Sequence, residues 1–467
     1  MPSPRLRRRS LLQALLFAAL SQQAATACHS RPRGNLRDPR EFEVIVIGAG
    51  IAGLAAAQAL QAQGRRVLVL EARDRLGGRI WTNHDLGFPI DLGAAWIHGN
   101  EGNPLLKLAA KAEAPTFATD DASVVIFAAN GQPLADAVIR AAEQRYYDLL
   151  RQVERWAEEL DQDVSLAAAI ARLDPQALSD PLLHYHLSAD LEFDLGGSIE
   201  DLSAWYWEDD EAFPGQDLLL PQGFEALIQV LAAGLDIRRQ QVVERIDARS
   251  PEGVTVDTER GQFQAAVAIA TLPLGLLKQQ TVEFLPPLPE AHQRAIARLG
   301  IGAVNKVVMR FPTAFWDETI QYFGNAGGAA ETYTYWINGR RFRDQNVLIA
   351  IASGQASLAH EARSDQEITA EVTALARRLF GPRAQPPEQV LITRWRRDPF
   401  AGGAYSYAAV GSTAEDFVTL AKPVAPRVLL AGEHTHRFHR GTAHGAYASG
   451  RRAAQQAQAI LGRPGLP

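Results

Sequence analysis

The sequence has a single cysteine, Cys28, in 467 residues and none beyond it. Disulfide bonds, thiolate metal sites and a cysteine nucleophile are therefore excluded from the rest of the chain. Excess charge is also small: 47 Lys and Arg against 53 Asp and Glu give a net charge of −6, so the strongly basic footprint of a nucleic-acid-binding protein is absent. The hydrophobic content of 47% excludes a disordered chain, and the length predicts two or three domains.

A long hydrophobic run is missing as well. The apolar stretch at residues 14–20 is much shorter than the roughly 20 residues of a membrane-spanning helix, so we expect no stable span. Arg7–Arg9, this stretch and the small residues before Cys28 are instead typical of an export signal over residues 1–28. The paired arginines indicate the bacterial twin-arginine route, which exports folded proteins; its machinery is an expected partner, and the expected location is periplasmic or secreted. A disordered basic tail is the alternative.

Cys28 stands where a mature chain could begin. Ala25 occupies the position at which a lipid-attachment signal usually has leucine, so we favour removal of Cys28 with the signal over its lipidation. We expect residues 29–40 to form a flexible leader.

The strongest local pattern is a strand that runs into a glycine-rich turn and a helix. Residues 43–47 are β-branched and apolar, and residues 54–63 have a helical pattern. Between them, Gly48 permits a tight turn, Gly50 lets a pyrophosphate approach the backbone, and Gly53 lets the helix pack close to the strand. This order predicts a dinucleotide site whose phosphates face the helix N-terminus; a purely structural glycine turn is the alternative.

A second strand, residues 66–70, ends at Glu71, where a carboxylate can bind an adenosine ribose. The next residues continue to Gly78 and Arg79 and resemble the extension of flavoproteins rather than of nicotinamide enzymes. Arg73 and Arg79 can neutralise diphosphate charge, or they are solvated arginines beside a turn.

The far end of the chain repeats this type of pattern. Residues 428–433 read as a strand that enters a turn at Gly432 and Glu433, and residues 441–459 begin with glycine and continue as an Ala-rich helix. A helix N-terminus here would place a positive dipole at the site.

These segments resemble the flavin-dependent amine oxidases, nearest to polyamine oxidases and to the catalytic domain of lysine-specific histone demethylases. The resemblance extends over the chain after residue 42. The other segments that carry it are residues 93–99, 103–105, 235–246, 271–278, 299–316, 395–400 and 402–407.

The resemblance implies an α/β fold: a Rossmann-like FAD-binding domain that is discontinuous in sequence, and an α+β substrate-binding domain of amine-oxidase type. The expected limits are 41–110, 210–285 and 390–467 for the FAD-binding domain, and 111–209 and 286–389 for the substrate-binding domain. Ala404 stands where monoamine oxidases attach flavin to a cysteine, so the FAD is expected to be non-covalent.

The resemblance also implies which residues contact FAD. They are Gly48, Gly50, Ala52, Gly53, Glu71, Ala72, Arg73, Gly78, Arg79, Gly93, Ala94, Ala95, Trp96, Val243, Trp395, Gly432, Glu433, Thr442, Ala443 and Ala446. No metal is expected, because the histidines at 434, 436, 439 and 444 lie within the flavin motif rather than at metal-ligand spacing.

For catalysis the resemblance singles out Lys306, which matches the lysine that holds a water beside the flavin. A desolvated amine could assist proton transfer or the reaction with oxygen, whereas the alternative is a strand-end lysine that reaches solvent. Trp395 and Tyr405 match aromatic walls that hold the amine; core aromatics are the alternative. Tyr407 is expected to serve packing.

His98 matches a position that hydrogen-bonds a distal amine of the substrate, although a lone histidine is more often structural. Glu192 matches an acidic position of the substrate channel more loosely, and helical surface charge is the slightly favoured alternative. Thr442 is expected to line the flavin pocket opposite Tyr405.

The implied reaction is oxidation of a C–N bond of a polyamine, either spermidine, spermine or an acetylated form. The imine would be hydrolysed to an aldehyde, and O2 would be reduced to hydrogen peroxide. The alternatives are a monoamine or L-amino-acid oxidase of the same fold, a flavin-dependent dehydrogenase or desaturase that uses another acceptor, and a flavin-containing binding protein. An export signal argues against histone demethylation.

Overall fold

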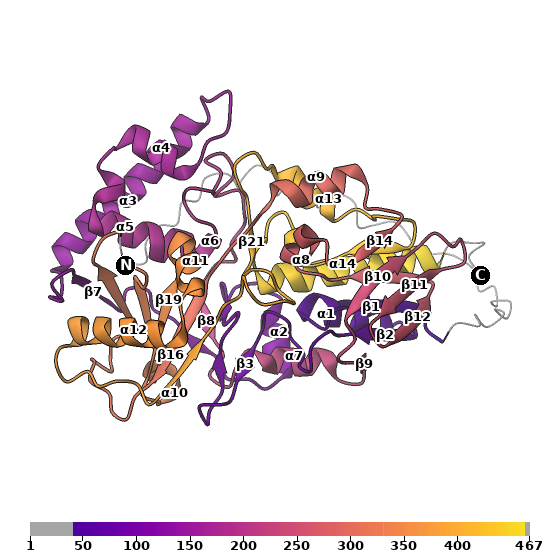
Figure 1. The fold of residues 1–467 in the computed structure, drawn as a ribbon, viewed down its shortest axis with the longest axis horizontal. Coiled ribbons are helices and arrows are strands. Elements are labelled where there is room, and N and C mark those ends of the chain that lie inside the picture. The colour runs from indigo at the N-terminus through magenta and orange to yellow at the C-terminus, as the bar shows by residue number, and fades with distance from the viewer. Residues whose placement is uncertain (1–40, 330, 463–467) are drawn as a thin grey trace. The chain divides into compact units, whose positions relative to one another are not determined.

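The computed structural model describes residues 41–329 and 331–462. The chain divides into a unit of residues Met1–Pro39 and a unit of residues Arg40–Pro467, and the description concerns the second (Figure 1). The expectations for the export signal, for Cys28 and for the leader lie outside the described residues.

A five-stranded parallel sheet forms the first core. Its strand order is β22 (Val428–Leu430), β13 (Val267–Ala270), β1 (Val44–Ile47), β2 (Val67–Leu70) and β9 (Asp236–Arg238). Because helices and strands cover both faces, β1 reads as an unbroken apolar run. Val44 and Val46 pack against α1 (Ile51–Gln61) and α14 (Ala443–Leu461), whereas Ile45 and Ile47 belong to the core on the opposite face.

The turn between β1 and α1 depends on two glycines. Gly48 has φ +101°, in the left-handed region that favours glycine, and a Cβ on Gly53 would lie 2.0 Å from the carbonyl oxygen of Gly48. The close strand-to-helix packing predicted for Gly53 is therefore confirmed.

A four-stranded sheet lies against the opposite face of the first, with α8, α9 and α13 in the same core. It runs in the order β12 (Gly261–Ala265), β11 (Val254–Thr258), β10 (Val243–Asp247) and β14 (Glu283–Leu285); the helices are α8 (Leu274–Gln279), α9 (Glu290–Arg298) and α13 (Ala414–Leu420). Short α7 (Glu225–Ala232) and α2 (Leu105–Lys111) complete the α1 side.

A six-stranded sheet forms the second main core. Its order is β20 (Gln389–Ile392), β16 (Asn305–Arg310), β19 (Val347–Ala352), β18 (Tyr335–Asn338), β17 (Tyr322–Ala326) and β7 (Val124–Ala128). The helix α12 (Asp365–Phe380) packs on it, capped by a reciprocal Ser364 and Glu367 box and followed by Gly381. Two short helices flank the sheet, α10 (Arg340–Arg343) and α11 (Gly354–Ala362).

Helices between residues 136 and 195 form a further apolar cluster. They are α3 (Asp136–Ala157), α4 (Leu166–Leu173), η1 (Ala177–Ser179), α5 (Pro181–His186), the π-helical turn η2 (Leu187–Glu192) and α6 (Phe193–Leu195). Leu149, Leu150 and Val153 have helical spacing, and all three are buried on α3.

Short strands between these cores bring the site segments together. They pair as β3 (Thr82–Asn83) with β4 (Ile90–Asp91); β5 (Trp96–Ile97) and β6 (Phe117–Ala118) with β8 (Leu218–Leu219); and β15 (Gly300–Ile301) with β21 (Ser406–Tyr407). Another short turn, η3 (Glu433–Thr435), follows β22.

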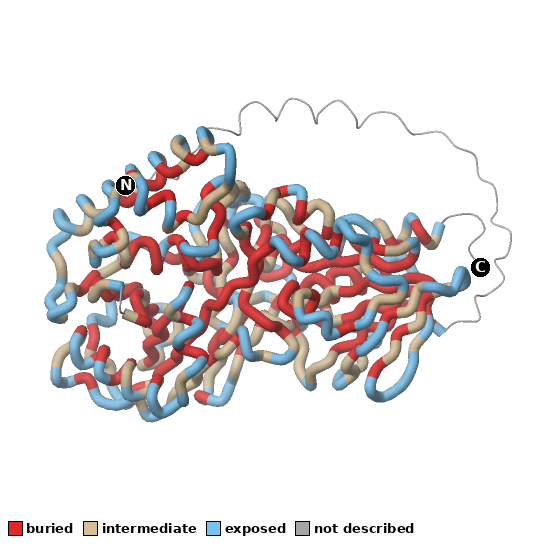
Figure 2. The backbone as a smooth tube through the Cα atoms, turned by 45° about the horizontal axis from the view of Figure 1, so that its top comes forward, coloured by how far each residue is buried: buried red, intermediate tan, exposed pale blue. Residues whose placement is uncertain are grey.

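Buried residues follow the strands of both main sheets, as the red tube in Figure 2 shows. The predicted strands at 43–47 and 66–70 are confirmed within one residue. Among the residues described, no helix is both long and apolar enough to cross a bilayer.

Candidate active site

The first turn of α1 has the properties of a phosphate site. The helix begins after Gly50 without a capping side chain and with no acidic residue in its first turn. A Cβ on Gly50 would meet only the carbonyl oxygen of Gly77, at 3.8 Å. The facing residues Gly77 and Gly78 both adopt a left-handed φ. Backbone N–H groups and a glycine-lined approach are what a diphosphate needs. Ala52 and Gly53 lie in this turn, both buried.

Glu71 lies at the end of β2 beside this turn, buried and held by two backbone donors. Ala49 N donates to Oε2 at 2.7 Å, and Arg73 N donates to Oε1 at 2.9 Å. The next residue, Ala72, is half-buried. The Glu71 carbonyl accepts a hydrogen bond from Gln241 N, which places Val243 on a neighbouring strand. The Arg73 guanidinium is itself paired with Asp398, at 2.5 Å.

Glu433 joins the two ends of the chain. Its carboxylate accepts hydrogen bonds from Arg79 Nη1 at 2.8 Å, from Gly441 N at 2.9 Å, and from Ser406 Oγ. Burial opposes ionisation, but Arg79 and the other donors lower the pKa of Glu433 in total, so the pair is ionic. Arg79 also donates to the carbonyl of Ala404 at 2.8 Å.

Lys306 lies in the buried strand β16, and only 6% of the residue is exposed. Its Nζ donates to the carbonyl oxygens of Asp91 at 2.9 Å and Gly93 at 2.8 Å, and it lies 5.5 Å from the centre of the Trp96 ring. Burial lowers the pKa of Lys306 to about 8 from the usual 10.5, against the opposing influence of the Asp91 carboxylate. The alternative of a lysine that reaches solvent is therefore wrong.

The segment around Gly93 joins Lys306 to Trp395. Trp395 is buried, donates from Nε1 to the carbonyl of Leu92 at 3.3 Å, and packs edge-on to Trp81. Ala94 is exposed, Ala95 is buried and Trp96 is half-buried in this same segment. The expected flavin-adjacent residues 93–96 thus lie directly beside the lysine.

A buried polar network holds Lys306 and Trp395 from behind. Asn305 Oδ1 accepts from Trp395 N at 3.0 Å, and Asn305 Nδ2 donates to Glu361 at 2.7 Å. Thr393 Oγ1 accepts from Lys306 N at 2.8 Å. Since all of these groups are buried and hydrogen-bonded, they fix the backbone on both sides of the lysine.

Tyr405 stands on the side of α14. Its hydroxyl donates to the carbonyl of Phe193, and its ring packs on Gly196, where a Cβ would lie 2.5 Å from Cε2. Thr442 caps α14: its Oγ1 accepts from Gly445 N at 3.0 Å. Gly441, next to Thr442, contacts the Tyr405 ring, so the two predicted pocket residues lie close together. Ala443 and Ala446 follow in the first turns of α14.

The sequence suggested a lone histidine at position 98, but His98 has a carboxylate partner, Asp217. Its Nδ1 lies 2.8 Å from Asp217 Oδ2, whose other oxygen accepts from Gly99 N at 2.8 Å. His98 keeps 41% of its side chain exposed. Phe213, His439 and His444 form a ring cluster nearby, in which Phe213 stacks on His439 at 5.0 Å.

Glu192 is buried, so the slightly favoured expectation that it is a surface charge of a helix is wrong. It ends the π-helical turn η2, only 8% of it is exposed, and Oε1 accepts from Ile199 N at 2.9 Å. Burial raises the pKa of Glu192 to about 7. The turn tilts this carboxyl inward against Gly354. Its role toward a substrate stays a prediction.

Two histidines of the flavin motif, His434 and His444, are buried. Burial lowers the pKa of His434 to about 4 and that of His444 to about 2. Within residues 41–329 and 331–462, no three His, Cys, Asp or Glu side chains are grouped as a metal site would require.

Sequence reasoning missed three charged residues of the site: Asp91, Asp217 and Arg343. The signal for Asp91 is a charge between apolar residues just before Gly93. Neither Asp217 nor Arg343 has a local signal, because each reaches the site through a contact with a segment more than 100 residues away.

Comparisons with known proteins agree with this geometry. Residues 51–458 match the family model of flavin containing amine oxidoreductases. The chain belongs to this family. As an enzyme of this family it uses FAD, and the uncapped turn of α1, the glycine-lined approach at Gly50 and the buried carboxylate of Glu71 fit that cofactor.

Two relatives are polyamine oxidases. Polyamine oxidase 2 of Arabidopsis thaliana is 34% identical over 441 residues, which cover 90% of this chain and 89% of the relative. Polyamine oxidase 4 of Oryza sativa subsp. japonica is 35% identical over 444 residues, with 91% and 90% covered. The lysine-specific histone demethylase 1 homolog 2 of the same rice is 36% identical, but only 56% of its length is covered.

Solved structures show the same fold. Wild-type putrescine oxidase bound to putrescine superposes with a TM-score of 0.74 at 22% identity, covering 90% of this chain and 99% of that chain. A double mutant of putrescine oxidase gives a TM-score of 0.75 at 21% identity, with 91% and 100% covered. The amine-oxidase fold, with its FAD-binding and substrate-binding parts, is therefore confirmed.

Proposed function

We propose that the enzyme oxidises a polyamine, either spermidine, spermine or an acetylated form, to an imine that water hydrolyses to an aldehyde, with O2 reduced to hydrogen peroxide. The observation that carries the proposal is the placement of Lys306: its buried Nζ contacts the Gly93 carbonyl and the Trp96 ring, and the neighbouring Asn305 binds the backbone of the buried Trp395. The relatives named as polyamine oxidases, which match over nine-tenths of their length, support the substrate class.

When bound, FAD supplies the oxidant that takes a hydride equivalent from the carbon beside the amine nitrogen. Lys306 is the proposed proton-handling group at this position: its Nζ faces two carbonyls and has a pKa of about 8, so it exchanges a proton near neutral pH. Trp395 and Tyr405 would enclose the amine, and Thr442 would border the same pocket.

His98 with Asp217 suits the distal end of a polyamine. A carboxylate 2.8 Å from the imidazole keeps a negative charge next to a ring that is 41% exposed, and a second ammonium of the substrate would find both an acceptor and a counter-charge there. Glu192 is the second proposed acid of the channel. A monoamine has no second nitrogen to use either group.

We also propose the roles of the remaining residues, the domain limits and the location. The FAD contacts are those expected from the sequence, with Ala404 leaving the flavin non-covalent. The limits are 41–110, 210–285 and 390–467 for the FAD-binding domain and 111–209 and 286–389 for the substrate-binding domain. Export by the twin-arginine route would put the folded enzyme in the periplasm or outside the cell.

Anaerobic reduction tests the proposed substrate class. FAD-loaded protein is mixed without oxygen with spermidine, spermine, N-acetylated spermine, benzylamine and an L-amino acid, and the loss of flavin absorbance is followed. The proposal predicts fast bleaching by the polyamines, slowed roughly tenfold or more by Asp217→Asn with little change for benzylamine. Fast bleaching only by benzylamine or the amino acid would reject the polyamine. Bleaching without peroxide in air would indicate another electron acceptor.

The export proposal has its own test. Residues 1–40 are fused to a fluorescent reporter that matures only in the cytoplasm, and periplasmic fluorescence is compared with a fusion carrying Arg7→Lys and Arg8→Lys. Periplasmic signal that the double substitution abolishes supports the twin-arginine route. Equal cytoplasmic retention of both fusions contradicts it.

A further inference from the structure

A buried charged pair, Asp91 and Arg343, lies next to Lys306. Neither residue is among those expected to contact FAD or the substrate amine. Asp91 from β4 is 4% exposed, and its Oδ1 accepts from Thr82 Oγ1 at 2.5 Å and from Phe224 N at 3.0 Å. Both groups donate, so the carboxyl is held as an acceptor. Burial raises the pKa of Asp91, while Thr82 and Arg343 act in the opposite direction.

Arg343 reaches this carboxylate from the end of α10. Its Nη2 lies 3.6 Å from Asp91 Oδ2, its guanidinium donates to the carbonyls of Pro221 and Leu220, and only 5% of its side chain is exposed. Its Nε has no hydrogen-bond partner among the described residues. A guanidinium is not deprotonated in proteins, so a permanent positive charge is buried here.

Lys306 completes a cluster of three charges. Its Nζ donates to the backbone oxygen of Asp91, which brings the Asp91 carboxylate and the Arg343 guanidinium into electrostatic contact with it. Ile351 from β19, Thr393 after β20 and Trp96 from β5 also contact Lys306 and are neutral. The Glu361 carboxylate of α11 contacts the side chain of Asn305, which lies on the other face of β16 from the Lys306 side chain. In this water-excluded place, one anion is shared by two cations.

We propose that Asp91 and Arg343 are positioning residues that set, with opposite signs, the pH at which Lys306 gives up its proton. The negative charge of Asp91 favours the protonated amine of Lys306, and the positive charge of Arg343 favours the neutral amine. The consequence rests on the proposed role of Lys306, because this balance decides whether the amine beside the flavin is protonated during turnover. The observations behind the proposal are the 2.9 Å hydrogen bond from Lys306 Nζ to the Asp91 carbonyl and the 3.6 Å distance between Arg343 Nη2 and Asp91 Oδ2.

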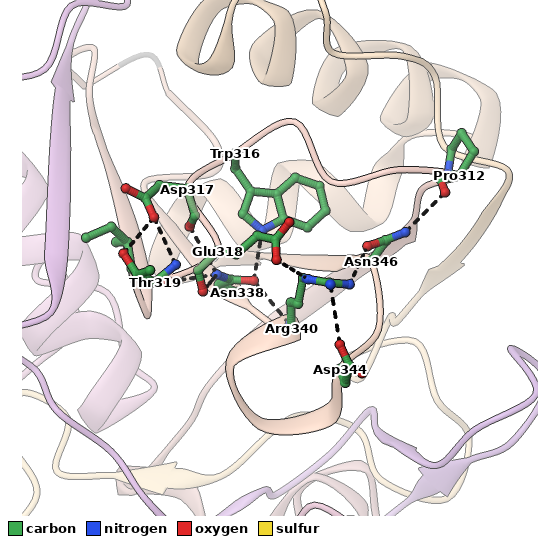
Figure 3. A network of polar contacts seen from close by, with 10 residues as sticks. Pro312, Trp316, Asp317, Glu318, Thr319, Asn338, Arg340, Asp344 and Asn346 are labelled. Atoms are coloured by element: carbon green, nitrogen blue, oxygen red, sulfur yellow. Dashed lines mark hydrogen bonds and ion pairs between the residues drawn. The ribbon is translucent and has the colours of Figure 1, made fainter.

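Helix α10 provides a matched control on the same short element. Arg340 lies three residues before Arg343, but its guanidinium pairs with Glu318 at 2.6 Å and Asp344 at 3.4 Å rather than with Asp91 (Figure 3). It also contacts Asn346 at 2.9 Å. Arg340→Gln therefore removes a cation from α10 without removing one from the surroundings of Lys306.

The experiment measures the protonation of Lys306 without turnover. The urea unfolding of FAD-loaded protein is followed from pH 6 to 10.5 for wild type, Asp91→Asn, Arg343→Gln, Arg343→Lys and Arg340→Gln, each also in the Lys306→Met background. The difference between a protein and its Lys306→Met partner isolates the titration of Lys306. The midpoint of that difference is the reported quantity, and it lies halfway between the pKa values of Lys306 in the folded and the unfolded protein.

We expect the midpoint to fall by roughly half a pH unit or more in Asp91→Asn and to rise by a similar amount in Arg343→Gln, which corresponds to a change of about one unit in the pKa of folded Lys306. Arg343→Lys, which keeps the cation, and Arg340→Gln should stay near wild type. Shifts of both variants in the same direction, or no shift in either, would overturn the proposal. If Asp91→Asn does not fold, the Arg343→Gln and Arg343→Lys pair still decides, since equal midpoints for these two would refute it.

This readout separates the inference from the proposed function. Opposite shifts in a protein that oxidises no polyamine would uphold the charge balance and reject only the substrate. Normal polyamine turnover with unchanged midpoints would uphold the proposed substrate and reject the charge balance. For a turnover readout, the acid limb of the pH profile of kcat should move with the midpoints, whereas a merely structural defect would lower kcat at every pH.

Discussion

Replacement of Lys306 by methionine should remove a specific pH dependence of stability. Folded Lys306 has a pKa of about 8 against the ordinary 10.5, because burial disfavours its ammonium. Between these two values the unfolded chain binds more protons at this site than the folded chain. Stability of the wild type therefore rises as the pH increases from about 8 to 10.5, and the cost of burying the charge is fully present below pH 8.

The magnitude follows from the difference between the two pKa values. At about 1.4 kcal/mol for each tenfold change, the gain between pH 8 and 10.5 is about 3 kcal/mol, as an order of magnitude for a fully buried amine. Methionine keeps the length and apolar volume of the chain but cannot titrate. Its loss of the hydrogen bonds to Asp91 and Gly93 adds a constant offset that does not change with pH.

The assay is urea unfolding of the FAD-loaded wild type and the Lys306→Met variant at constant ionic strength, at several pH values from 7 to 10.5. The free-energy difference between the two proteins should change by about 3 kcal/mol across this window, with wild type gaining as pH rises. Two parallel pH curves would refute the reasoning, because they would mean that Lys306 titrates in the folded protein as it does in the unfolded chain. Lys107→Met, at an exposed lysine of α2, serves as the control, and the free-energy difference between it and wild type should stay nearly constant with pH.

Other substitutions test the rest of the site. Glu433→Gln should leave Arg79 without its ion pair and weaken flavin retention roughly tenfold or more; flavin release measured by fluorescence should be unchanged if the pair is irrelevant. Glu361→Gln should lower kcat more than it changes KM, because it disturbs Asn305; a change in KM alone would contradict this. Glu192→Gln should abolish a loss of stability of about 3 kcal/mol as pH rises from 4.5 to 7, since a raised pKa favours the neutral folded form; equal pH curves would exclude it.

The FAD side of the molecule was predictable because its signals are local. A β-branched run, glycines at fixed offsets and an acid at the end of the next strand determine the turn, the helix and the buried carboxylate of Glu71 within about 30 residues. The structure places Gly48, Gly53 and Glu71 as that pattern requires. The long helix α14 was visible in the same way, through its glycine and alanine pattern.

The charges around Lys306 and His98 were not predictable, because they depend on contacts between distant segments. Arg343 meets Asp91 and Asp217 meets His98 only after the short strands β4, β5 and β8 have brought those segments together. The prediction for Glu192 was wrong for a different reason. Glu192 ends the π-helical turn η2 and is buried against Ile199 N, and nothing in the sequence marks that turn.

Peroxide release is the most direct test of the central claim that this is a polyamine oxidase that uses Lys306. Purified, FAD-loaded protein is assayed with putrescine, spermidine, spermine, their acetyl forms, a benzylamine-type monoamine and several L-amino acids, in parallel with Lys306→Met. The account predicts peroxide with spermidine, spermine or an acetyl form, with kcat reduced roughly a hundredfold or more in the variant. Peroxide only from monoamines or amino acids, or a variant as active as wild type on polyamines, would contradict it.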